Sequence, residues 1–191
     1  MYVKMHDVIR DMALWIASHC GQKHNNDFVQ AGIHLMVAPN PEKWQGVEGM
    51  SLMKNAVESS LETSMCPALL TLFLNKNQLR MISSDFFNFM LSLIVLSLSY
   101  DNLLKELPSS VSNLVSLKSL NLSHMGIIQL PIELQTLTKL KCLNLEDSYE
   151  PDKIPMELMP VISRLQILRI LNCGFNKKEL AESILSDPSE F

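Results

Sequence analysis

The sequence contains little glycine and no glycine-rich motif. Six glycines occur in 191 residues, and none of them begins the G-x-x-x-x-G-K-[ST] pattern with which a phosphate loop cradles a nucleotide. The G-x-S-x-G motif of serine hydrolases and the H-E-x-x-H motif of zinc proteases are also missing from the sequence. We therefore predict that the chain is not an enzyme.

Cysteine is also scarce, and its positions exclude a disulfide framework. The four cysteines form no C-x-x-C pair: Cys20, Cys66, Cys142 and Cys173. We expect reduced thiols in a cytoplasmic protein, because structural disulfides belong to oxidising compartments. Met1 is followed by YVKMHD rather than by a basic and then apolar signal peptide. One group contains metal-ligand types (His19, Cys20 and His24), but its spacing matches no standard site, so we predict no metal.

Neither charge nor hydropathy indicates a nucleic acid or a membrane as partner. The formal net charge is −4, with 47% hydrophobic and 19% charged residues, which is typical of a globular domain. No Lys/Arg cluster predicts binding to nucleic acid or to an acidic membrane surface. The most apolar stretch, residues 86–98, is interrupted by polar residues and is shorter than the ~20 residues that a membrane-spanning helix needs.

What the sequence does contain is leucine at fixed intervals. The stretch LKSLNLSHMGI, residues 117–127, has the pattern L-x-x-L-x-L-x-x-(N)-x-L of a leucine-rich repeat. The pattern occurs six times at intervals of 22 to 25 residues, with first positions at Val47, Leu69, Leu93, Leu117, Leu140 and Leu165. Because each unit is too thin to bury its own leucines, the units must stack to form a core. We therefore predict an α/β fold, a leucine-rich-repeat solenoid of about six units.

Within each unit the pattern assigns a role to each segment. The L-x-L core predicts a short strand whose side chains alternate between the core and the surface. The connecting segments that begin near Pro108, Pro131 and Pro155 predict short helical or 3₁₀ turns, because proline fits the first helical position. The ninth position usually holds an asparagine that bonds to loop backbone groups, and here it holds Asn55, Asn77, Asp101, Met125, Ser148 and Cys173. We expect a looser ladder at Met125, whose side chain accepts hydrogen bonds only weakly.

The segments outside the repeats divide the chain further. Residues 1–38 are expected to form a small winged-helix-like remnant, with a helix over residues 6–18 and two strands, Tyr2 to Met5 and Phe28 to Ala31, that pair across it. Residues 39–46 read as a linker because prolines flank Asn40. Repeats then fill residues 47–175. Residues 176–191 include a weakly amphipathic helix over residues 177–187, at best a partial cap, which suggests a fragment.

The outward-facing residues of the strands are the candidate binding positions. A repeat solenoid presents its strands on a concave face that binds proteins, and aromatic and arginine side chains carry most interface energy. The candidates are Phe73, Lys76, Tyr100, Lys118, His124, Lys141, Glu146 and Arg169. For each one the alternative is an ordinary solvated side chain of a strand face.

The pair His6-Asp7 has two readings. From the residues alone, Asp7 is a cap or first-turn acid of the following helix and His6 an ordinary histidine. The stretches YVKMHDVIRDMALWIAS, FVQAG, PEKWQGVEGMSLM, CPALLTLFLNKNQL and LPIELQTLTKLKCLNLED, however, resemble plant coiled-coil nucleotide-binding leucine-rich-repeat disease-resistance proteins over about residues 1–175. Met5-His6-Asp7 matches that family's MHD motif at the end of its nucleotide-binding module.

The resemblance implies a role for the motif and for the repeats. In that family the histidine contacts the phosphates of bound ADP and the aspartate supports its geometry, which makes His6 a phosphate sensor and Asp7 its support. The phosphate loop and coiled coil are absent from this sequence, so we expect no cofactor here, although the intact family protein binds ADP or ATP. The implied partners are a pathogen effector, a guarded host protein and the missing nucleotide-binding module.

One alternative function remains open from the sequence. The chain could be a free-standing intracellular leucine-rich-repeat adaptor without any nucleotide switch. An adaptor predicts a capped solenoid, whereas the receptor reading predicts an exposed apolar face at the N-terminal remnant, where the missing module would dock. An extracellular receptor ectodomain would need cysteine-paired caps and a leader, which the sequence lacks.

Overall fold

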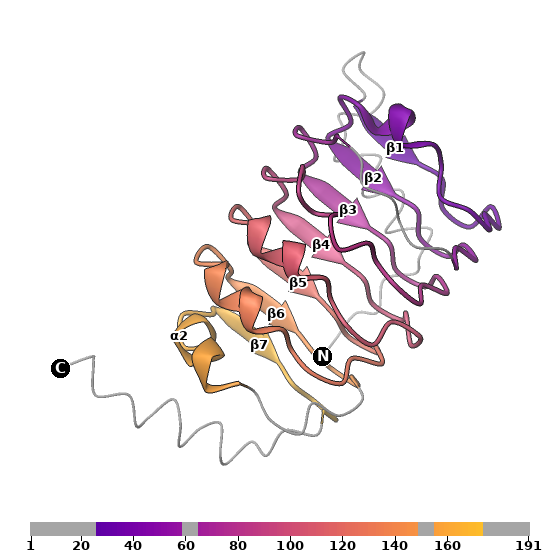
Figure 1. Ribbon diagram of the computed structural model, residues 1–191. Coiled ribbons are helices and arrows are strands. Elements are labelled where there is room, and N and C mark those ends of the chain that lie inside the picture. Colours follow the sequence, from indigo (N-terminus) through magenta and orange to yellow (C-terminus); the bar gives the residue numbers. More distant parts are fainter. Residues whose placement is uncertain (1–25, 59–64, 149–154, 174–191) are drawn as a thin grey trace.

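Seven three-residue strands form one parallel sheet in which the strands follow sequence order (Figure 1). The computed structural model describes residues 26–58, 65–148 and 155–173. The strands are β1 (Asp27–Val29), β2 (Gly49–Ser51), β3 (Thr71–Phe73), β4 (Val95–Ser97), β5 (Ser119–Asn121), β6 (Cys142–Asn144) and β7 (Ile167–Arg169). We call each strand with its flanking loops a rung, numbered by its strand. Neighbouring strands of one orientation stacked in this order confirm the predicted leucine-rich-repeat solenoid.

One core runs through all the rungs because the fourth repeat positions are in register. Their order across the sheet is Met50, Leu72, Leu96, Leu120, Leu143 and Leu168. All but Leu168, which is partly buried, are at most 2% exposed. The leucines that the repeat pattern places inside are therefore shared between neighbouring rungs. Each buried leucine contributes about 1.5–3 kcal/mol, which no single rung obtains alone.

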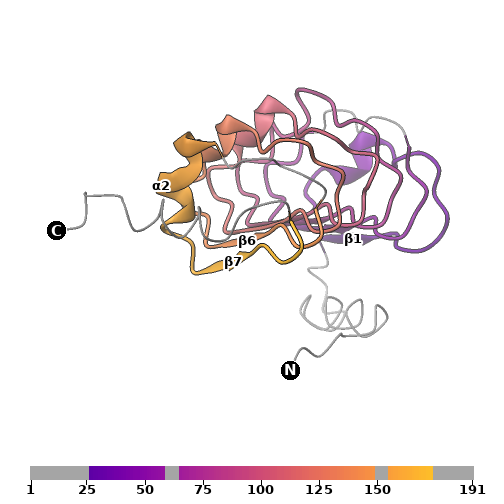
Figure 2. The same cartoon turned by 90° about the horizontal axis from the view of Figure 1, so that it is seen from below.

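Short helical turns cover the side of the core opposite the strands (Figure 2). They are η2 (Pro41–Trp44), η3 (Ser109–Asn113), η4 (Ile132–Thr136), η5 (Met156–Leu158) and α2 (Met159–Ile162). The predicted turns after the three prolines are confirmed. Each proline, however, is the N-cap rather than the first helical residue: Pro108, Pro131 and Pro155. The extended backbone of a cap suits proline, whose φ is fixed and which has no N–H to satisfy.

The prediction of six units is short by one rung. The expected strand near Phe28 exists, but it pairs with β2 in parallel, with Phe28 opposite Met50. It does not pair within the described residues with any other segment, and its expected partner, Tyr2 to Met5, lies outside them. Phe28 packs against the core in the place where the later rungs have leucine. The repeat pattern missed this rung because one aromatic residue replaces the leucine series.

The segment expected to be a linker contributes a large core residue. Asn40 caps η2 by accepting a hydrogen bond from the amide of Glu42 at 2.9 Å. Trp44, at the end of that turn, is 1% exposed and meets Phe86 edge to face, with ring centroids 6.1 Å apart. Phe86 in turn lies 5.0 Å from Phe87. Trp44 therefore attaches the end of this turn to the core of the solenoid.

The ninth repeat positions form a hydrogen-bonded ladder along the loops. Asn55 accepts from the amides of Ile33 and Leu35, both at 3.1 Å, and donates to the carbonyls of Gln30 and Leu52. Replacement residues keep part of this pattern. Ser148 donates to the Leu122 carbonyl, Cys173 to the Ile170 carbonyl, and Asp101 accepts from the Asn77 and Leu79 amides. The ladder joins several neighbouring loops, and it is interrupted at Met125.

The expected loosening at Met125 does not reach the strands. Next to it, the Leu122 amide donates to the Asn144 carbonyl and the His124 amide to the Glu146 carbonyl, both at 2.8 Å. The Met125 side chain is fully buried, so it replaces a polar loop contact with apolar packing. The loop closes tightly beside it, because a Cβ on Gly126 would lie 2.1 Å from the Asn102 carbonyl oxygen.

Three sequence-based expectations fall on residues that the structure does not describe. They are the helix over residues 6–18 with His6 and Asp7, the group of His19, Cys20 and His24, and the tail helix over residues 177–187. These stay predictions, as does the division of the chain into a remnant, a linker, repeats and a tail.

Candidate protein-binding surface

A column of residues with left-handed backbone runs along the ends of the strands. Each lies four positions after the central core residue of its strand: Gly32, Lys54, Lys76, Tyr100, His124, Asp147 and Asn172, with φ between 52° and 69°. For a residue other than glycine this conformation costs roughly 1–2 kcal/mol. The sheet enforces it, because the amide of each column member from Lys54 to Asp147 donates to a carbonyl of the next rung at 2.8–3.0 Å.

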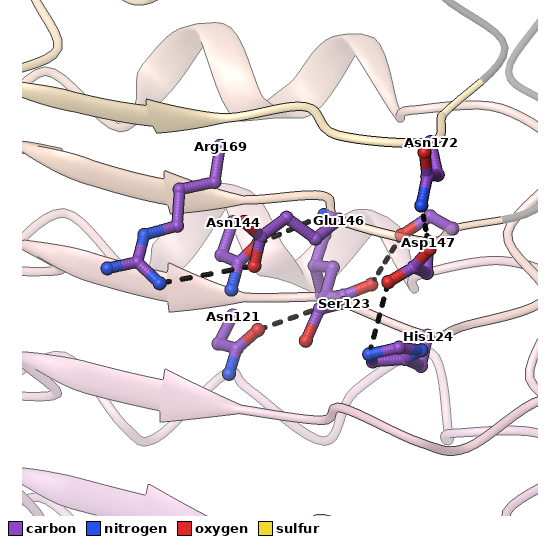
Figure 3. A network of polar contacts seen from close by, with 10 residues as sticks. Asn121, Ser123, His124, Asn144, Glu146, Asp147, Arg169 and Asn172 are labelled. Carbon is purple, nitrogen blue, oxygen red and sulfur yellow. Dashed lines mark hydrogen bonds and ion pairs between the residues drawn. The ribbon is translucent and has the colours of Figure 1, made fainter. Parts of the chain in front are cut away.

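Five of these side chains contact one another in an unbroken series, which we call the edge column. The Lys76 ammonium lies 5.0 Å from the centroid of the Tyr100 ring, a cation–π contact. Tyr100 stacks on His124 with ring centroids 4.1 Å apart. His124 Nε2 lies 3.4 Å from Asp147 Oδ2, and Asn172 Nδ2 donates to Asp147 Oδ1 at 2.9 Å (Figure 3). The edge column therefore spans five rungs and combines a cation, two aromatic rings and an acid.

A second set of polar side chains lies on the strands beside the edge column. Asn121 Oδ1 accepts from the Ser123 amide at 3.1 Å, and Asn144 Oδ1 accepts from the Glu146 amide at 3.0 Å (Figure 3). Arg169 Nη1 lies 3.9 Å from Glu146 Oε2. These bonds fix the side chains of three consecutive rungs on the same face as the edge column.

The predicted binding residues form three groups in the structure, with one residue apart from them. Lys76, Tyr100 and His124 belong to the edge column, and Glu146 pairs with Arg169. Lys118 and Lys141 are exposed and lie on adjacent rungs before β5 and β6. Phe73, at the end of β3, is only partly exposed and joins none of these groups. The binding role of all eight residues stays a prediction.

Sequence reasoning missed four members of this surface: Asp147, Asn172, Asn121 and Asn144. The signal was present, since Asp147 and Asn172 hold the same eighth repeat position as Lys76, Tyr100 and His124. Likewise Asn121, Asn144 and Arg169 share the fifth position. These four residues are identified when the residues at the same position of successive repeats are compared with one another.

A buried acid lies directly behind the edge column. Asp101 follows Tyr100 and is completely buried. Burial raises the pKa of its carboxyl to about 7, although hydrogen bonds from the Leu79 and Asn77 amides lower it. Its Oδ2 atom has no hydrogen-bond partner among the described residues. The acid therefore holds the loop at the repeat position where rung 3 uses Asn77.

The described ranges contain neither a metal-binding group nor a membrane-spanning helix. No group of three or more histidine, cysteine, aspartate or glutamate side chains there is arranged to hold a metal ion. Within the same ranges, no helix has the length and apolar character required to cross a membrane.

The strand register, the repeated buried leucines and the asparagine ladder define a leucine-rich-repeat protein. Solved structures agree with this class. A leucine-rich-repeat protein of Leptospira interrogans matches with a TM-score of 0.61 and 27% identity, covering 77% of this chain and 37% of that one. The leucine-rich-repeat ectodomain of the Arabidopsis receptor kinase HAESA, solved with a peptide hormone ligand, matches with a TM-score of 0.58 and 27% identity. That match covers 70% of this chain and 24% of the ectodomain chain.

Comparison with curated sequences identifies the family, although no protein-family model matches the chain. The disease resistance protein RPS5 of Arabidopsis thaliana is 48% identical over 144 residues, which are 75% of this chain and 16% of that protein. The Arabidopsis disease resistance protein UNI is 41% identical over 186 residues, 97% of this chain and 20% of that protein. The chain belongs to the plant disease resistance proteins, and it spans about a fifth of the length of these relatives.

Proposed function

We propose that this chain is the recognition and regulatory part of an intracellular plant immune receptor. Its strand face binds a protein partner, either a pathogen effector or a guarded host protein. In the intact receptor the same solenoid restrains a nucleotide-binding module. The relationship to RPS5 and UNI supports the receptor class, and the edge column is the observation that supports the strand face as the binding surface.

The composition of the edge column favours binding over a purely structural role. Tyrosine and histidine beside a lysine offer stacking, cation–π and hydrogen-bonding contacts of the kind that dominate interface energies. Tyr100 keeps 40% of its surface exposed despite its contacts on both sides. Backbone strain persists at such positions only where the surrounding structure enforces it, and it is concentrated at functional sites.

Exposed apolar residues on rung 1 favour a receptor fragment over a free-standing adaptor. Val29, Ile33, Met36 and Val37 are between 56% and 67% exposed. These four side chains are the candidate docking surface, because contiguous exposed apolar residues are characteristic of interaction sites. The receptor reading predicts such a surface near the N-terminal remnant, where the nucleotide-binding module would dock.

His6 and Asp7 keep their proposed roles only in that larger context. By resemblance, His6 senses the phosphates of ADP and Asp7 supports it. Holding a nucleotide also requires backbone and cationic donors around the phosphates, and this sequence has no phosphate loop. The motif therefore acts with a nucleotide-binding module and not by itself.

A chimera in full-length RPS5 tests the proposal. The matching segment of RPS5 is replaced by this chain, and defence-associated cell death is scored in leaves with and without a trigger. We expect Tyr100→Ala/His124→Ala to alter either the resting or the triggered response. The control Ile132→Ala/Gln135→Ala, on exposed positions of η4, should leave both unchanged. Equal responses from all three chimeras at equal protein levels would contradict the proposal.

A further inference from the structure

Rungs 5 and 6 carry the same surface sequence in the same register. Both contain L-K-x-L-N-L, at residues 117–122 and 140–145. Leu120 lies opposite Leu143 and Asn121 opposite Asn144, and the Lys141 amide donates to the Lys118 carbonyl at 2.9 Å. The repeat thus places two lysines side by side at one end of the strands and two asparagines side by side at the other.

The two asparagines are oriented by their own rungs. Each Oδ1 atom accepts a hydrogen bond from the backbone amide two residues later, at Ser123 and at Glu146. An amide whose oxygen is held in this way directs its NH₂ group to the other side. Figure 3 shows the nitrogen atoms of Asn121 and Asn144 away from these bonds, and both side chains are partly exposed. They present two parallel donors to the strand face.

The two lysines add positive charge that the neighbouring residues leave unbalanced. Neither Lys118 nor Lys141 has a carboxylate partner within the described ranges. The equivalent positions on the flanking rungs hold Ile94 and Gln166, which are uncharged. Glu146, which lies 3.9 Å from Arg169, and Asp147, which lies 3.4 Å from His124, follow β6 at the opposite end of the strand from Lys141. Rungs 5 and 6 therefore carry two exposed lysines at the start of their strands and two partly exposed asparagines at the end.

We propose that these four side chains bind an extended, acidic segment of a protein partner. This inference rests on the proposed function and specifies its ligand chemistry. Adjacent rungs are about 4.8 Å apart, and three strand residues separate each lysine from its asparagine by roughly 10 Å. A carboxylate of the segment lies between the lysines, while backbone carbonyls a few residues away accept from the asparagine NH₂ groups.

The geometry favours a peptide over a nucleic acid. Nucleic-acid binding relies on many cations that follow a phosphate backbone, whereas this site has two lysines in a chain of net charge −4. Two carboxamide donors at one end of two neighbouring strands and two lysines at the other suit a chain that alternates side-chain carboxylates with backbone carbonyls. The site also adjoins the edge column, so a longer segment contacts both.

Fluorescence anisotropy with a labelled peptide of alternating glutamate and threonine tests the site on the full chain. We expect saturable binding that weakens with salt, and at least about tenfold weaker binding by Lys118→Glu/Lys141→Glu. The matched control Lys43→Glu/Lys105→Glu makes the same charge change at exposed positions elsewhere and should retain binding. The double variant Asn121→Ala/Asn144→Ala leaves the net charge unchanged and should also weaken binding. Its control, Asn102→Ala/Gln129→Ala, removes two exposed amides elsewhere and should retain binding.

Several outcomes would overturn the inference. The unmodified chain could bind a glutamine–threonine peptide as tightly as the glutamate–threonine peptide, or a single-stranded oligonucleotide more tightly. The two lysine double variants could lose binding equally. The folded, unmodified chain could also show no saturable binding of the acidic peptide. The RPS5 chimera separates this failure from failure of the proposed function. If the edge-column variants still change the chimera's response, only the acidic-segment inference is lost.

Discussion

Tyr100 and His124, 24 residues apart in sequence, stack with ring centroids 4.1 Å apart and planes inclined by 16°. Both rings are held on residues with left-handed backbone, at φ 67° and 54°. Neither type is favoured there, and glycine adopts the conformation at little steric cost. The stacked pair therefore occupies positions where folding alone would favour another residue.

Tyr100→Gly separates the binding role of this position from its structural role. Loss of the ring contacts costs on the order of 1–2 kcal/mol, and relief of the backbone strain returns about as much. We expect the free energy of unfolding in urea to change by less than about 1 kcal/mol, while the RPS5 chimera loses its normal response. A large loss of stability would show that Tyr100 is retained for folding.

Asn55 should be among the most important polar residues for the stability of rungs 1 and 2. Alanine at this position removes the partners of two amides and two carbonyls, which costs about 2–4 kcal/mol. Hydrogen exchange checks this locally, because the amides of Ile33 and Leu35 should lose protection while that of Leu122 does not. Asn102→Ala, at an exposed loop position, is the control; similar losses in both variants would refute the ladder's role.

Gly126 is required by a close backbone approach. Its Cβ in Gly126→Ala would lie 2.1 Å from the Asn102 carbonyl oxygen, so the loops of rungs 4 and 5 must separate. We expect a loss of about 1–3 kcal/mol in the free energy of unfolding. Gly46→Asn provides a comparison, since Gly46 has φ +77° with open space around it and asparagine tolerates that conformation. Equal effects of the two substitutions would contradict the packing explanation.

The part of the fold that depends on leucine periodicity was predictable, and the contacts between polar side chains were not. Strand order, register and the core follow from the recurrence of Leu72, Leu96, Leu120 and their equivalents. Rung 1 was missed because Phe28 stands where later rungs have a leucine series. The edge column was found only in part, because the repeat pattern does not show which outward side chains meet between rungs.

Isothermal titration calorimetry with ADP tests the proposed division of labour between this chain and a nucleotide-binding module. We expect no binding or very weak binding by the chain alone, because a single histidine does not supply the donors that cradle phosphates. His6→Ala should therefore give the same titration as the unmodified chain. A dissociation constant in the low micromolar range for the unmodified chain would contradict this expectation.

Asp101 makes the stability of the solenoid depend on pH. Its pKa is raised from 3.8 to about 7 in the folded state by burial, so the folded chain holds this proton over a range in which the unfolded chain has released it. The contribution of Asp101 to stability is therefore complete below pH 3.8, falls as the pH rises toward 7, and is constant above that. The total loss is on the order of a few kcal/mol.

Asp101→Asn should remove this dependence. The amide oxygen still accepts from the Asn77 and Leu79 amides. In the variant an NH₂ group replaces the Oδ2 atom, which has no hydrogen-bond partner in Asp101. Asn77, at the same repeat position of rung 3, uses its NH₂ group to donate to the Leu74 carbonyl. We expect similar urea midpoints for the two chains near pH 4, and a more stable variant at pH 8, because a buried carboxylate is costly where a neutral amide is not. A variant that is less stable than the parent at pH 8 would show that the ionised carboxylate is favoured at this position.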